Sequence, residues 1–170
     1  MESQLELAHA ISLESNRDVK DYRTQAVKIR LPGGAYAVPD FAIRKINDDW
    51  EIHEVKPDSR YLTEKCLLRF NQMEIIAKQN NVGFRIIDSR DLPDTKEMDR
   101  MIWLYNRSHA RKYTHMEISL ARELLEEADS PKHARSILLE NDLPAYLFDY
   151  LAFHQLLDSN ASTRGVRNDE

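Results

Sequence analysis

Hydrophobic positions recur at two different spacings in the first half of the chain. In residues 2–13 the apolar side chains Leu5, Ala8 and Ile11 are three positions apart, which predicts a helix with one buried face. Short apolar runs then follow, and turn sequences rich in Pro, Gly, Asn and Asp separate them. These runs predict strands at residues 24–31, 35–43 and 50–56.

A second helix is expected directly after the last of these runs. The sequence Pro57-Asp58-Ser59 can end a strand and cap a helix that continues to about residue 80, and another strand is expected at residues 84–88. The order strand, helix, strand favours a parallel crossover. The expected fold class is therefore α/β, with a mixed central sheet flanked by helices.

Beyond Pro93 the apolar spacing becomes helical throughout. Helices are expected at residues 98–105, 116–128, 131–139 and 144–157. Residues 159–170 carry few hydrophobic side chains, which is typical of a disordered tail. The predicted organisation is a domain at 1–92, a helical region at 93–158 and a tail at 159–170.

Composition narrows the possible functions. With 24 basic and 29 acidic residues the chain has a net charge of −5, so its overall charge gives weak affinity for nucleic acid. A single cysteine, Cys66, excludes a disulfide framework, and the six histidines lack the spacing of zinc ligands. No apolar run reaches membrane-spanning length and no signal peptide is recognisable, so we expect a cytoplasmic protein without a membrane partner.

Three residues suggest a catalytic centre. Asp40 closes the short apolar run at residues 35–38, and Glu54 and Lys56 end the next run, where alternation directs both side chains to one face. Two carboxylates can hold Mg²⁺ and leave room for a phosphate, while a lysine can stabilise charge in the transition state. The alternative interpretation is that Asp40 is a turn residue and that Glu54 and Lys56 are an exposed pair. His53 is expected to turn to the opposite face and to have a packing role.

Over roughly its first ninety residues the chain resembles the TnsA-type endonuclease subunits of heteromeric transposases. The matching segments are Glu2-Ser3-Gln4-Leu5-Glu6, Asp18-Val19, Tyr22, Gln25, Pro39-Asp40-Phe41, Glu54-Val55-Lys56-Pro57 and Phe84-Arg85-Ile86-Ile87-Asp88. Relatives carry residues ahead of the first segment, which here begins at residue 2, so we expect the chain to be trimmed there. The Gln-x-x-x-Tyr feature of RecB-like nucleases is missing, since Ile76 stands four residues after Gln72.

The resemblance implies a restriction-endonuclease-like core of the PD-(D/E)xK type. It implies catalytic roles for Glu6, Asp40, Glu54 and Lys56, with Glu6, Asp40 and Glu54 as ligands of Mg²⁺ or, as a substitute, Mn²⁺. Glu2 is an alternative to Glu6 as the helical acid. The implied activity is cleavage of the non-transferred strand of double-stranded DNA at transposon ends.

The resemblance also implies a TnsB-like transposase and a TnsC-like ATPase regulator as partners, with the helical region contacting them or DNA in helix-turn-helix style. A stand-alone phage or repair nuclease and a non-cutting adaptor of the same fold stay open as alternatives. Basic clusters are the candidate DNA contacts in an acidic chain, although a solvated charged surface is the alternative for each. Their members are Arg60, Lys65, Arg69, Arg107, Arg111 and Lys112.

Overall fold

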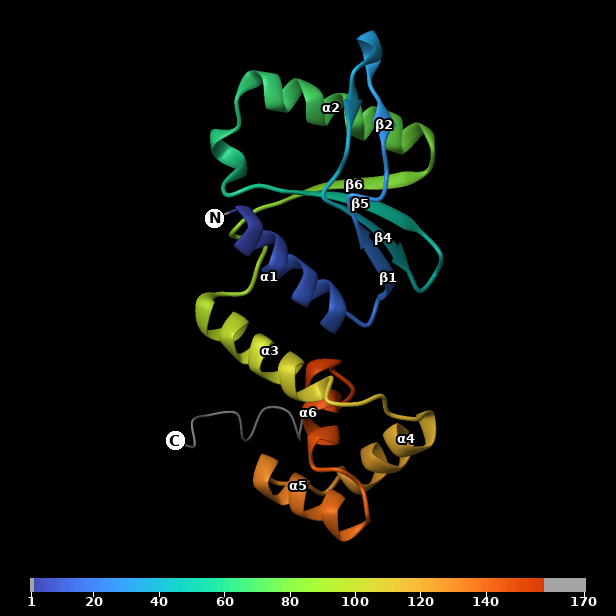
Figure 1. The fold of residues 1–170 in the computed structure, drawn as a ribbon, viewed down its shortest axis with the longest axis vertical. Coiled ribbons are helices and arrows are strands. Elements are labelled where there is room, and N and C mark those ends of the chain that lie inside the picture. The colour runs from blue at the N-terminus through green and yellow to red at the C-terminus, as the bar shows by residue number, and fades with distance from the viewer. Residues whose placement is uncertain (1, 158–170) are drawn as a thin grey trace. The chain divides into compact units, whose positions relative to one another are not determined.

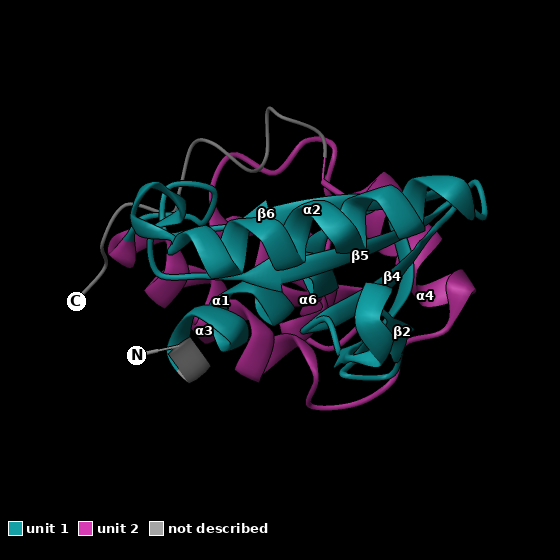
Figure 2. Cartoon of the chain, turned by 90° about the horizontal axis from the view of Figure 1, so that it is seen from above, with its two compact units in different colours: residues 1–94 teal, residues 95–170 magenta. Residues whose placement is uncertain are grey.

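The computed structural model describes residues 2–157, so the predicted tail at 159–170 lies outside the described residues. The chain divides into two compact units, unit 1 at Met1–Asp94 and unit 2 at Thr95–Glu170 (Figure 2). This division lies close to the boundary expected after residue 92. Each unit is described by itself below.

Unit 1 is built around a four-stranded mixed sheet in the order β1-β4-β5-β6. Its strands are β1 (Val19–Thr24), β4 (Phe41–Lys45), β5 (Trp50–Val55) and β6 (Val82–Ile87). The β1–β4 and β4–β5 pairs are antiparallel and the β5–β6 pair is parallel. The expected α/β class, mixed sheet and parallel crossover are confirmed.

Helices cover both faces of this sheet: α1 (Glu2–Ser15) on one face and α2 (Glu64–Gln79) on the other (Figure 1). The core on the α1 face contains Leu13 with sheet residues that include Phe41 and Val55. The core on the α2 face contains Phe70, Met73 and Ala77 of α2 with Ala42 and Ile52. Because strand side chains alternate, Ile52 and Glu54 project toward α2, whereas Val55 projects toward α1.

A short hairpin, β2 (Ile29–Arg30) with β3 (Tyr36–Ala37), extends on the α2 side of the sheet (Figure 1). The buried side chains Ile29, Leu31 and Ala37 join the same core as α2. A one-turn 3₁₀ helix, η1 (Pro32–Gly34), forms the tip. The hairpin therefore lies over the sheet face that carries Glu54.

The continuous strand predicted at residues 24–31 does not form, although Thr24 lies in β1 and Ile29–Arg30 form β2. The chain instead forms β1 at Val19–Thr24, leaves the sheet at Gln25, whose φ is 49°, and only then forms β2. β1 is an edge strand whose side chains are mostly exposed, so it lacks the apolar pattern of a buried strand. The run predicted at residues 35–43 is likewise two strands, β3 and β4, interrupted at Pro39, which has no N–H for a strand ladder.

The helix predicted to begin after Pro57-Asp58-Ser59 begins later. Asp58 caps a 3₁₀ turn, η2 (Ser59–Tyr61), through a side chain that accepts from the Arg60 amide. Thr63 then caps α2 by accepting from the Cys66 amide at 3.3 Å. Cys66 of α2 is partly buried against the core on the α2 face.

Unit 2 consists of helices α3 (Thr95–Ser108), α4 (His115–Leu124), α5 (Pro131–Glu140) and α6 (Tyr146–Phe153). The apolar segment at 146–151 supplies Leu147, Phe148 and Leu151 to the core of this unit. Buried Asp149 accepts hydrogen bonds from Arg107 at 3.0 Å and from Arg135 at 2.7 Å. Across the described residues, none of the helices combines the length and apolar character that crossing a membrane requires.

Candidate active site

Asp40 stands where the chain enters β4, and both its backbone and its side chain are held. Its carbonyl accepts the Gln25 amide at 3.0 Å, and its carboxylate Oδ2 accepts the Val55 amide at 2.8 Å. The β4–β5 register pairs Phe41 with His53, so Asp40 lies beside the end of β5. The sequence predicted that Asp40 closes the apolar run before it. In the structure Asp40 instead leads into β4, and its carboxylate is fixed at the sheet.

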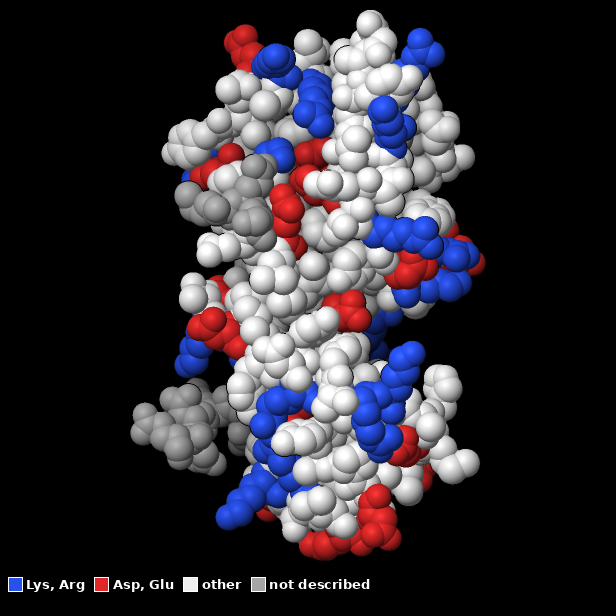
Figure 3. Space-filling view, viewed as in Figure 1, with Lys and Arg blue, Asp and Glu red and all other residues white. Residues whose placement is uncertain are grey.

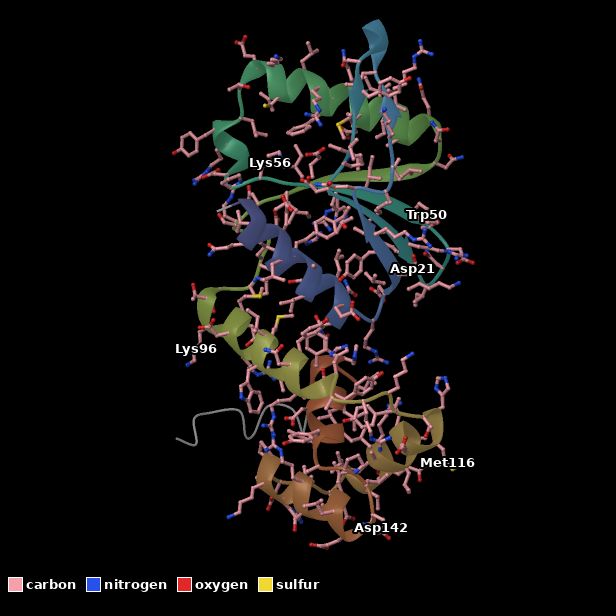
Figure 4. The ribbon with its side chains drawn as sticks, viewed as in Figure 1. Asp21, Trp50, Lys56, Lys96, Met116 and Asp142 are labelled. Atoms are coloured by element: carbon pink, nitrogen blue, oxygen red, sulfur yellow. The ribbon has the colours of Figure 1, made fainter. Side chains whose placement is uncertain are left out.

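Lys56 connects the two candidate carboxylates. It directly follows β5, where the chain leaves the sheet (Figure 4), and its Nζ lies 3.6 Å from Asp40 Oδ2 and 3.3 Å from Glu54 Oε2. The same Nζ donates to the Val55 carbonyl at 2.8 Å. Only 19% of the Lys56 side chain and 16% of the Asp40 side chain are exposed, so these charges interact with little screening by water.

Glu54 is the most buried member of this cluster, with 3% of its side chain exposed. Burial raises its pKa, the neighbouring Asp40 charge raises it further, and Lys56 and Arg69 oppose the rise. Among the described residues, Glu54 Oε1 has no hydrogen-bond partner, and the Arg69 guanidinium is 3.8 Å from it. A buried carboxylate oxygen without a hydrogen bond is costly, because the water that it would bind has been removed and no hydrogen bond replaces it.

The predicted helical acid is not part of this cluster. Glu6 is half-buried on α1, and no hydrogen bond or ion pair joins it to Asp40, Glu54 or Lys56 within the described part of the chain. The side chain of Glu2 lies outside the described residues. The physical reason is that α1 packs on the sheet face opposite to the one from which Glu54 projects.

The side chains present fit a hard divalent cation through two carboxylates. Asp40 and Glu54 supply carboxylate oxygens as metal ligands. Among the described residues, the buried oxygen Glu54 Oε1 accepts no hydrogen bond. A larger ligand set is not assembled: residues 2–157 contain no group of three or more His, Cys, Asp or Glu side chains that could hold a metal ion. The three-carboxylate set Glu6, Asp40 and Glu54 is therefore reduced to two members in the structure.

A second polar group lies on the α1 face and was missed from the sequence. His9 Nε2 is 2.9 Å from His53 Nδ1, and His53 Nε2 is 3.1 Å from Glu51 Oε2. Lys45 donates to the other Glu51 oxygen at 2.5 Å. His53 thus turns away from Glu54, as alternation predicts, but it is hydrogen-bonded rather than merely packed. The spacing of two residues between Glu51 and His53 was the available signal.

The loop after Lys56 is anchored to the end of β6 by buried Asp88. Ser59 donates to Asp88 Oδ2 through its amide at 3.2 Å and its hydroxyl at 2.6 Å, and Arg90 pairs with the same carboxylate. The Arg90 and Ser59 hydrogen bonds lower the pKa of Asp88. This contact ties the two parallel strands together at their carboxyl ends, next to the candidate site.

The basic candidates of unit 1 differ in their surroundings. Arg69 points toward Glu54, and Arg60 is paired with Asp58 at 2.6 Å. Lys65 is exposed on α2. In Figure 3, acidic side chains gather between α1 and α2, and basic side chains lie above them over α2. Arg69 and Lys65 are therefore the better placed candidates in this unit.

The basic candidates of unit 2 are mainly engaged in its own structure. Arg107 binds buried Asp149 and lies over the rings of Trp103 and Tyr146, with distances of 4.5 Å and 4.7 Å to their centroids. Arg111 pairs with Glu117 at 2.5 Å. Lys112 is exposed.

Comparison of the sequence with known protein families gives no match, and comparison with curated proteins gives none either. The functional argument for this chain therefore depends on the geometry of its own side chains.

Proposed function

We propose that unit 1 is a metal-dependent DNA endonuclease of the PD-(D/E)xK type, acting as a TnsA-like subunit of a transposase. The observation that carries the proposal is that one ammonium, Lys56 Nζ, lies within 3.6 Å of Asp40 and 3.3 Å of buried Glu54. Residues 14 positions apart in the sequence thus form one small group of two carboxylates and a lysine, a composition suited to metal-assisted phosphodiester hydrolysis.

Each side chain has a separate task in this proposal. The Asp40 carboxylate is oriented by the Val55 amide, so it presents its other oxygen in a fixed direction. Glu54 is a buried acid whose raised pKa reflects the cost of its charge in this environment. Lys56 donates hydrogen bonds to water or to phosphate oxygens and stabilises the negative charge that develops as the bond to phosphorus breaks.

Asp40 and Glu54 are the residues that would hold Mg²⁺ or Mn²⁺. A bound cation supplies polarisation of the phosphoryl oxygen and lowers the pKa of a coordinated water. Binding would also compensate the repulsion between the two carboxylates, which is one cause of the raised pKa of Glu54. The chain's own contribution is to fix both acids beside Lys56 before substrate arrives.

The proposed substrate is double-stranded DNA at transposon ends, cut on the non-transferred strand. The net charge of −5 disfavours unaided capture of DNA, which supports delivery by TnsB-like and TnsC-like partners. We therefore expect the purified chain to bind DNA weakly and to cleave slowly until those partners position it. Efficient sequence-specific cutting by the isolated chain would favour the stand-alone nuclease.

A second candidate function is a non-cutting adaptor of the same fold. It is favoured by the absence of a group of three metal-ligating side chains within residues 2–157, and by the pairing of Lys56 with both acids. In an adaptor the Asp40, Glu54 and Lys56 group would serve only as a buried charge network that stabilises the sheet.

Cleavage assays with a Lys56→Ala variant distinguish the two candidates. DNA with transposon ends is incubated with the chain, its partner subunits and Mg²⁺ or Mn²⁺, and nicking of the non-transferred strand is measured. We expect Lys56→Ala to lower the rate by roughly a hundredfold or more while folding and partner binding persist, because the lysine acts in the transition state. Lys78→Ala, which removes an exposed lysine in the last turn of α2, is the matched control. Absence of cleavage by the wild-type assembly, or equal rates for wild type and Lys56→Ala, would favour the adaptor.

A further inference from the structure

The β2–β3 hairpin carries an unusual distribution of charge for this chain. Residues 25–39 contain Lys28 and Arg30 and no Asp or Glu, although the whole chain has a net charge of −5. Three basic side chains of the central sheet are neutralised: Lys20 and Arg44 bind Asp48, and Lys45 binds Glu51. The hairpin is therefore a locally basic segment in an acidic protein.

The two faces of the hairpin have different roles. Ile29 and Ala37 form one cross-strand pair and are buried against α2, while Arg30 and Tyr36 form the other pair and are exposed. Because side chains alternate, Lys28 lies on the same outward face as Arg30. The inner face thus fixes the hairpin on unit 1, and the outer face is presented to solvent.

The outward face combines an aromatic ring with two cations. Tyr36 is 56% exposed, and Lys28 Nζ lies 4.3 Å from the centroid of its ring. Within residues 2–157, no hydrogen bond or ion pair joins Lys28 or Arg30 to a carboxylate. Figure 3 shows basic side chains and no acidic side chain over this hairpin. Such a surface attracts a polyanion, because its cations neutralise phosphates and few carboxylates repel them.

The tip of the hairpin allows a close approach. Gly33 and Gly34 have φ values of 82° and 86°, which side-chain-bearing residues rarely adopt, and no atom lies within 4 Å of a Cβ built on either. The absence of side chains at Gly33 and Gly34 leaves their backbone accessible. A two-stranded ribbon of this width can also enter the major groove of DNA.

The hairpin is directly connected to the candidate site. Its second strand continues through Val38 and Pro39 to Asp40, and its buried residues share a core with Ile52 on the sheet face that carries Glu54. A duplex bound to the hairpin would therefore contact a segment that leads, within three residues of β3, to Asp40. This continuity selects DNA over an unrelated anionic partner.

We propose that the outward face of the β2–β3 hairpin, formed by Lys28, Arg30 and Tyr36, is a docking surface for the phosphate backbone of double-stranded DNA. The inference rests on the proposed function, because it identifies the element of unit 1 that would bind the DNA substrate. Lys28 and Arg30 neutralise phosphates. Tyr36, which lies under Lys28 and is the cross-strand partner of Arg30, packs against the sugar–phosphate backbone. The contact is independent of sequence and of metal.

Fluorescence anisotropy with a short fluorescein-labelled duplex in EDTA tests this surface without any cleavage. The full chain is titrated at several salt concentrations, and the slope of log K against log salt is compared between variants. Each lost phosphate contact should reduce that slope by about 1, so Lys28→Ala/Arg30→Ala should reduce it by about 2. The charge reversal Lys28→Glu/Arg30→Glu should weaken binding further.

Arg122→Ala/Lys132→Ala is the matched control, because it removes the same charge from exposed positions of unit 2. Unchanged slopes in the control support the inference. Equal slopes for wild type and the hairpin variant, an equal loss in the control, or no binding at the lowest salt would overturn it. Unfolding midpoints confirm that all variants are folded, since the substituted side chains are exposed.

The result is separable from the nuclease proposal. Hairpin-dependent binding by a chain that shows no Lys56-dependent cleavage would support the docking surface and remove the nuclease. Lys56-dependent cleavage with slopes that the hairpin variant leaves unchanged would keep the nuclease and overturn the docking surface.

Discussion

Binding of a divalent cation to Asp40 and Glu54 should raise the thermal stability of unit 1. A ligand that binds only the folded state adds RT ln(1 + [L]/Kd), which is about 1.4 kcal/mol at ten times Kd. One kcal/mol shifts the unfolding midpoint of a domain of about 60–100 residues by about 4–8 °C. Unit 1 spans Met1–Asp94, so the expected rise with Mn²⁺ or Mg²⁺ is about 6–11 °C.

The most informative variant for this prediction is Asp40→Asn. Asp40→Ala also removes the ligand, but it leaves the Val55 amide without the acceptor that it has at 2.8 Å, and a lost partner of that kind costs about 1–3 kcal/mol by itself. Asparagine keeps an oxygen for that amide and loses only the charge. Asp40→Asn should therefore fold with near wild-type stability in EDTA and show no response to metal.

Thermal unfolding is followed by fluorescence in a Trp103→Phe background, so that Trp50 of β5 reports unit 1. Asp48→Asn is the control, because Asp48 is an exposed carboxylate that binds Lys20 and Arg44 away from the site. An equal rise in wild type and Asp40→Asn would refute the metal site. So would a loss of response in the Asp48→Asn control.

Two further predictions concern stability. Burial and positive neighbours lower the pKa of His9 to about 4, so between about pH 6.5 and pH 4 the unfolded chain binds the extra proton. Urea titrations should show the free energy of unfolding falling by about 3 kcal/mol as the pH is lowered across that range. His9→Gln should make the free energy of unfolding less dependent on pH, and an equal pH dependence in both proteins would contradict this. Asp149→Asn should destabilise unit 2 by roughly 3 kcal/mol, because its two arginine partners lose their buried counter-charge. Trp103 fluorescence in a Trp50→Phe background measures that loss of stability. The control is Asp142→Asn, at an exposed position, and equal stability of the two variants would contradict the prediction.

The spacing of apolar residues predicted those helices and strands whose buried residues repeat within the element itself. α1, β5, α2, β6 and the four helices of unit 2 each contain an apolar repeat of their own, and such repeats are visible without tertiary contacts. β1 escaped prediction because it is an edge strand with polar side chains such as Lys20, Asp21 and Arg23, and only pairing with β4 makes it a strand.

The candidate site divides in the same way. The sequence by itself placed Glu54 and Lys56 on one face, because strand side chains alternate over two residues. Tertiary structure decided that Asp40 reaches them, since its distance to Lys56 depends on the antiparallel register of β4 and β5. It also decided that α1 brings His9 to His53 on the opposite face and leaves Glu6 outside the cluster. Sequence periodicity fixes which way a side chain points, whereas strand pairing and helix packing fix which distant side chain it meets.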